Sequence, residues 1–121
     1  MSLHCWDDPA TATTGRFVPV LMYHSVSSVA SKRFRPFATD PAVFVEHMAA
    51  LQGAGVQFMT VGQYIGAANQ VQTAASRQVV VLTFDDAFSD FCAEVLPVLA
   101  DFNLPATLYV PTDYVGATSW L

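Results

Sequence analysis

The sequence predicts an α/β fold in which parallel strands alternate with helices. Four short apolar runs have the composition of buried strands, and the segments between them carry apolar residues at helical spacing. Residues that commonly cap helices precede two of these segments. Strands that alternate with helices are joined by crossover connections, so we expect the four strands to be parallel. The 121 residues have room for a single domain.

The first expected strand is Val18–His24, a run of branched and aromatic residues that we expect to be buried on both faces. Residues 1–16 show no periodicity, and we expect them to form an irregular N-terminal arm ahead of a domain spanning 17–121. Residues 25–39 have the character of a loop.

The first expected helix begins at Asp40 and Pro41, because aspartate is a favoured N-cap residue and proline fits the first helical position. We expect this helix to end at Gly53 or Gly55. Its buried face is predicted from apolar residues spaced i, i+4 and i+7, namely Phe44, Met48 and Leu51.

A second strand is expected over residues 57–61, followed by a helix through Ala68. Thr60 and Gln63 have the spacing of a capping box, in which each side chain bonds to the other residue's backbone amide.

The strand over residues 79–84 is the clearest of the four, since it is an almost continuous apolar run. A helical stripe follows from Phe88, with Pro97 expected to kink it or divide it in two, and Asn103 expected to end it in the left-handed conformation. The fourth strand is expected over residues 106–110.

Charge and cysteine content exclude several classes of function. Five basic residues against ten acidic ones give a net charge of −5 and exclude a phosphate-neutralising nucleic-acid surface. Residues 32–35 form one short basic cluster, which is either a solvated loop or a contact to an anionic ligand. Two cysteines, Cys5 and Cys92, are too few for a disulfide scaffold or a cysteine zinc site. No apolar run is long enough to span a membrane.

Chemistry in parallel α/β folds is placed where strands end, so the polar residues after each run are the candidates for function. The adjacent carboxylates Asp85 and Asp86 are the most informative, because burying an unpaired charge is costly. In one interpretation Asp86 caps the next helix and loop amides bind Asp85. A glycosidase pair does not fit, since neighbouring residues of a strand point apart. The spacing also differs from that of a phospho-receiver domain. The remaining interpretation is a metal site with a base beside it.

The sequence resembles the polysaccharide deacetylase family, the NodB homology domain, over roughly residues 17–121. The segments that carry the resemblance are Val18–His24, the helix over 44–55, Thr83-Phe-Asp-Asp86 and Leu104–Val110. The resemblance implies the first half of a deformed (β/α) barrel. It also implies a metal-dependent hydrolase that removes N-acetyl groups from an amino-sugar polymer.

By the same resemblance, Asp85 matches the catalytic base and Asp86 matches a ligand of a divalent metal, commonly zinc. Other residues are expected at the rim of the site: His24, Thr83, Thr112 and Asp113. A cell-envelope or extracytoplasmic location is the family's expectation, although this chain shows no signal peptide.

The sequence departs from the family pattern in two ways. Ala87 stands where the family usually has glycine, which argues against a turn with positive φ at that position. The family's paired histidine ligands have no counterpart, because His4, His24 and His47 are widely separated. We therefore expect half of a deacetylase domain that neither binds zinc tightly nor turns over substrate, whether truncated, proteolysed or encoded by a degenerate gene.

Two further expectations follow from an incomplete barrel. The alternative function is a non-catalytic half domain that binds a glycan or a protein. Exposed strand edges and an uncovered inner face favour self-association, and a homodimer is the expected form.

Overall fold

A computed structural model describes residues 18–71 and 78–116. Its main sheet is parallel throughout and is centred on β5 (Val79–Phe84). Strand β1 (Val20–Tyr23) pairs with one side of β5. The other side of β5 pairs with β4 (Gln57–Met59) near its start and with β6 (Thr107–Leu108) near its end. The expected parallel α/β architecture is confirmed.

The central strand and its neighbour β1 differ in burial. All six residues of β5 are buried, as its apolar run predicts. In β1 only Leu21 and Tyr23 pack against the core, whereas Val20 and Met22 are 55% and 60% exposed. The prediction that this strand is buried on both faces is therefore wrong. Among the described residues β1 pairs only with β5, and nothing covers the face that carries Val20 and Met22.

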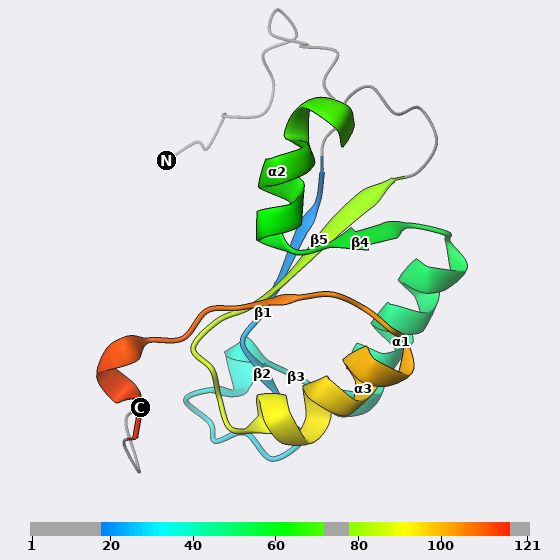
Figure 1. The fold of residues 1–121 in the computed structure, drawn as a ribbon. Helices are drawn as coiled ribbons and strands as arrows, with labels where there is room; N and C mark the ends of the chain where they lie inside the picture. The colour runs from blue at the N-terminus through cyan, green and yellow to red at the C-terminus, as the bar shows by residue number, and fades with distance from the viewer. Residues whose placement is uncertain (1–17, 72–77, 117–121) are drawn as a thin grey trace, which may run out of the picture.

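The described residues form three α-helices: α1 (Pro41–Gly53), α2 (Val61–Val71) and α3 (Leu96–Asp101). Figure 1 shows α1 and α3 side by side, and α2 apart from them at the end where β1 and β5 begin. Phe44 and Met48 of α1 and Leu99 of α3 are buried in one core with the β5 side chains Val80, Leu82 and Phe84. At the opposite end of the sheet, β1 and β5 finish and are followed by loop segments.

The helix boundaries follow the capping signals. The Asp40 carboxylate accepts a hydrogen bond from the Ala42 amide at 2.9 Å. At the other end of α1, Gly55 adopts a φ of 71° and its amide binds the Gln52 carbonyl. Thr60 and Gln63 form the expected reciprocal pair, with distances of 2.9 Å and 3.1 Å.

The helical stripe after Phe88 is divided into two pieces, as Pro97 predicts. A π-helical turn, η3 (Phe91–Val95), precedes α3, and the Leu96 amide bonds five residues back to the Phe91 carbonyl. Pro97 has no amide to donate to the preceding turn, so the irregular winding lies directly before it. Asn103 ends α3 with a φ of 52°, which confirms the predicted left-handed position.

Residues 25–39 are more ordered than a loop prediction implies. Strands β2 (Ser25–Val26) and β3 (Ala38–Thr39) pair in parallel, and a 3-10 turn, η2 (Arg35–Phe37), lies between them. Two-residue strands carry too little periodicity to be recognised in a sequence. The pairing closes the base of the segment 27–37.

The fourth strand is shorter than the sequence predicts. The fourth strand pairs over two residues instead of the five predicted, and Tyr109 and Val110 beyond it are each 49% exposed. The expected arm over residues 1–16 lies outside the described residues. Within the described ranges, no helix has the length and apolar character needed to cross a bilayer.

Candidate active site

The candidate site begins where β1 and β5 end together. The Asp85 amide donates to the Tyr23 carbonyl at 2.9 Å, so the pairing continues one residue past Tyr23 and Phe84. His24 and Asp85 therefore leave the sheet from neighbouring strands at the same edge. Both residues are half-buried. The fold brings together two candidates that lie 61 positions apart in the chain.

A turn in the left-handed region follows β5. Asp86 has a φ of 71° and Ala87 a φ of 48°. Alanine at position 87 predicts that the chain makes no turn with positive φ here. This prediction is wrong, because Ala87 adopts that conformation despite its Cβ. Non-glycine residues in this region cost about 1–3 kcal/mol each, and such strain concentrates at functional sites. The turn redirects the chain directly after the central strand and places Asp86 at its tip.

Asp86 lines a pocket of about 160 Å³ whose other walls are aromatic. The pocket is bounded by His24, Phe34, Phe37 and Phe88. The rings of His24 and Phe37 lie 5.6 Å apart between centroids, and those of Phe34 and Phe88 lie 5.8 Å apart. The site thus places one carboxylate and one imidazole in a pocket whose other walls are apolar side chains.

Asp86 also lines a second, more open pocket of about 290 Å³. It is lined by Asp86, Ala87, Ser89, Val110, Pro111, Tyr114, Val115 and Gly116. Thr112 and Asp113 belong to the 3-10 turn η4 (Thr112–Tyr114) and are exposed, but they line neither pocket. Thr83 also lines neither, because it is buried inside β5, opposite Met22 and Thr107.

The two carboxylates have no partners in the described part of the chain. Neither the Asp85 nor the Asp86 side chain forms a hydrogen bond or an ion pair with another described residue. The possibility that Asp86 caps the following helix is also excluded, because that helix begins near Asp90 and Phe91. Carboxylates left half-buried without structural partners are available to bind a ligand or accept a proton.

A neighbouring serine and aspartate support this arrangement. The Ser25 hydroxyl donates to Asp90 Oδ2 at 2.5 Å, which connects the residue after His24 to the segment after Asp86. Asp90 Oδ1 is buried and has no partner among the described residues. The bond joins the two chain segments that form the site.

The described residues do not complete a metal site. In the ranges 18–71 and 78–116, no group of three or more His, Cys, Asp or Glu side chains could hold a metal ion. A catalytic zinc ion takes three protein ligands, and Asp86 with His24 in its pocket supplies at most two.

Sequence reasoning missed several of these residues. Phe34, Phe37 and Phe88 form walls of the pocket, although the sequence predicts a loop over residues 25–39 and a helix from Phe88. Two phenylalanines close to three basic residues were an available signal, because large apolar side chains in a loop usually pack against something. Ser25 and Asp90 gave no comparable signal.

Comparisons with known proteins agree on one family. A family model described as polysaccharide deacetylase matches residues 72–120. A putative polysaccharide deacetylase of Bacillus subtilis, YxkH, is 31% identical over 99 residues, which is 82% of this chain and 33% of that protein.

Solved structures give the same result. The Streptococcus pyogenes deacetylase PplD, in complex with acetate, matches with a TM-score of 0.73 at 26% identity, covering 88% of this chain and 49% of that one. A de-N-acetylase from Aggregatibacter actinomycetemcomitans matches with a TM-score of 0.69 at 25% identity, covering 83% and 39% of the two chains. The chain thus spans a third to a half of the length of these relatives, and it has the fold of the corresponding part of the two solved structures.

Proposed function

This chain belongs to the polysaccharide deacetylase family, and we propose that it carries the carboxylate half of an active site that hydrolyses N-acetyl groups on an amino-sugar polymer. The observation that carries the proposal is the pair of unpartnered carboxylates beside His24 where β1 and β5 end. The relatives named as deacetylases share this part of the fold, which supports the reaction class.

The reaction adds water across the bond between the acyl carbon and nitrogen, giving acetate and a free amine. In the proposal, Asp85 accepts a proton from the attacking water as its oxygen bonds to the acyl carbon. The amine leaves as the C–N bond breaks and needs a proton in exchange. His24 lines the same pocket as Asp86, and we assign it this donation.

Asp86 has a different role in the proposal, as one ligand of a divalent metal, with zinc as the expected ion. A bound metal polarises the acyl oxygen and lowers the pKa of water. The described residues fall short of a full ligand set, so we assign no step of the reaction to the metal. For the same reason we propose that the 121 residues alone bind zinc weakly and are inactive.

The test measures acetate released from N-acetylglucosamine oligomers by the longest polypeptide that the gene encodes. We expect Asp85→Asn to lower kcat by about 10²- to 10⁴-fold, the contribution of a general base. Asp101→Asn is the matched control, because Asp101 is an exposed carboxylate at the end of α3. Its activity should stay within twofold of the natural sequence.

The alternative function is a binding module without catalysis. It would be supported if the polypeptide released no acetate but bound N-acetylglucosamine oligomers, with a Kd that Asp85→Asn leaves unchanged. Loss of activity in Asp101→Asn equal to that in Asp85→Asn would contradict the assignment of Asp85 as the base.

A further inference from the structure

We propose that the segment 27–37, termed the basic loop, binds negatively charged groups on the polymer whose acyl group enters the Asp86 pocket. The inference rests on the proposed function and specifies its substrate: an N-acylated amino-sugar polymer that carries carboxylate or phosphate groups.

The first observation that supports this inference is the distribution of positive charge. The chain has five basic residues, and Arg16 and Arg77 lie outside the described residues. The other three are Lys32, Arg33 and Arg35, all of them exposed and all in the basic loop. None forms an ion pair with an acidic side chain in the described part of the chain, although acidic residues outnumber basic ones two to one. Their charge is not used to stabilise this fold.

The basic loop is also held in a defined conformation. Pairing of β2 with β3 closes its base, and the Ser27 amide donates to the Thr39 carbonyl at 2.9 Å. Within the loop, the Ser31 carbonyl accepts hydrogen bonds from the amides of Phe34 and Arg35, at 3.0 Å and 2.8 Å. A loop ordered before binding loses less conformational entropy when a ligand arrives. It is therefore a better recognition element than a solvated linker would be.

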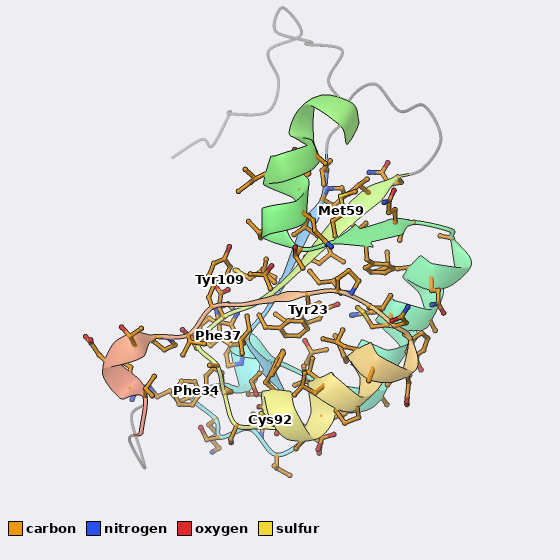
Figure 2. All side chains as sticks on the ribbon, in the orientation of Figure 1. Tyr23, Phe34, Phe37, Met59, Cys92 and Tyr109 are labelled. Carbon is orange, nitrogen blue, oxygen red and sulfur yellow. The ribbon has the colours of Figure 1, made fainter. Side chains whose placement is uncertain are left out.

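The aromatic residues of the loop connect its charges to the site. Phe34 and Phe37 line the pocket that contains Asp86 and His24, and Figure 2 shows both side chains on the same side of the molecule. The Arg33 guanidinium carbon lies 5.6 Å from the centre of the Phe34 ring. A guanidinium in this position keeps N–H groups free to bind a carboxylate or phosphate. The three cations are thus within a few residues, along the sequence, of the two phenylalanines that line the pocket.

The amount and placement of charge favour an anionic glycan over a nucleic acid. Three exposed cations on a chain of net charge −5 are far fewer than the basic surface that nucleic-acid binding needs. They suffice to select among polymers already held by the pocket. A neutral polymer would gain nothing from them, so the preference for charged polymers is the measurable consequence.

The experiment measures Kd by calorimetry for three N-acetylated probes: a neutral N-acetylglucosamine oligomer, a copolymer of N-acetylglucosamine with a uronic acid, and a phosphate-linked N-acetylglucosamine polymer. The protein is the 121-residue chain and its triple variant Lys32→Gln, Arg33→Gln, Arg35→Gln. We expect the triple variant to raise Kd for one or both anionic probes by about 3- to 30-fold, as three exposed ion pairs would. Binding of the neutral oligomer should change less than twofold. The two anionic probes distinguish carboxylate from phosphate.

A variant with matched net charge isolates the position of the cations. Ala42→Glu, Ala49→Glu and Ala93→Glu together lower the net charge by the same three units at exposed helical positions. It should leave the anionic preference in place, and raising the salt concentration should abolish that preference only in proteins with an intact basic loop. Thermal unfolding of each variant verifies that it folds, and Arg35→Gln alone provides a milder second variant.

Three results would overturn the inference: equal Kd values for neutral and anionic probes, equal weakening by the matched-charge variant, or competition by single-stranded DNA as strong as that by the anionic glycans. None of these three results would contradict the proposed deacetylation of a neutral oligomer. Conversely, failure of the longest polypeptide that the gene encodes to release acetate would reject the proposed function, while selective binding of anionic glycans by the 121-residue chain would remain measurable.

Discussion

The Ser25 hydroxyl and the Asp90 carboxylate form a 2.5 Å hydrogen bond between segments 65 residues apart. Ser25 is only 4% exposed, and the other carboxylate oxygen of Asp90 is buried without a partner among the described residues. The bond holds the strand that follows His24 against the segment that follows Asp86. Its geometry therefore governs how the two sides of the Asp86 pocket meet.

Removal of this hydroxyl should destabilise the fold. Ser25→Ala leaves both oxygens of the Asp90 carboxylate without a protein partner, and a buried group left unsatisfied costs about 1–3 kcal/mol. Urea unfolding of Ser25→Ala, Asp90→Ala and the double variant measures the coupling between the two residues. We expect the double variant to be less destabilised than the sum of the single ones. Strict additivity would show that the bond contributes nothing.

Glycine at position 87 should stabilise the chain. Ala87 has a φ of 48°, where its Cβ is strained, and glycine adopts this conformation freely. Part of the gain is offset because glycine also makes the unfolded chain more flexible, so we expect Ala87→Gly to add about 0.5–1 kcal/mol to the free energy of unfolding. Ala49→Gly, at an exposed position within α1, should lower it by a similar amount. A loss of stability in Ala87→Gly would contradict the assigned φ.

Local signals in the sequence predicted most of the elements. Asp40, the Thr60–Gln63 pair and Asn103 act through contacts a few residues away, so their patterns are visible in the sequence. The half-exposed state of β1 could not be predicted, because it depends on what lies beside the strand. The same holds for the site. Asp85 and Asp86 were identifiable as adjacent carboxylates, but the pocket beside Asp86 depends on Phe34 and Phe37, which lie in the segment between β2 and β3.

Stability above pH 10 should depend on Tyr23. Burial raises the pKa of the Tyr23 hydroxyl above its ordinary value of 10.0, and that hydroxyl lies 3.0 Å from His47 Nδ1. In the unfolded chain the hydroxyl ionises near its ordinary pKa, while in the folded chain it stays protonated to higher pH. Its contribution is therefore complete below pH 10 and is lost as the pH rises through the folded-state pKa.

The measurement is urea unfolding between pH 8 and 11 for the natural sequence and for Tyr23→Phe. The difference in free energy between the two proteins isolates this residue from the other tyrosines. We expect that difference to be constant up to about pH 10. Above that pH, the free energy of unfolding of the natural sequence should fall relative to that of Tyr23→Phe. A difference that stays constant up to pH 11 would contradict the effect of burial.

The exposed face of β1 predicts that the chain associates with itself. Val20 and Met22 lie on one face of β1, and Leu108 of β6 and the residues beyond it, Tyr109 and Val110, are between 36% and 49% exposed. Unpaired strand edges and uncovered apolar faces bind other chains, and a pairing of two identical faces closes as a dimer. We expect a dimer whose population falls on dilution.

Light scattering across a dilution series measures this association, with Met22→Lys as the disrupting variant. A lysine at Met22 places a charge on the exposed face, so the variant should be monomeric at concentrations where the natural sequence is dimeric. Ile65→Lys, at a 68% exposed position on α2, is the matched control and should leave the dimer intact. A mass of 13.1 kDa for the natural sequence at every concentration would show that this face has no affinity for itself. Dissociation by Ile65→Lys equal to that by Met22→Lys would instead place the contact away from β1.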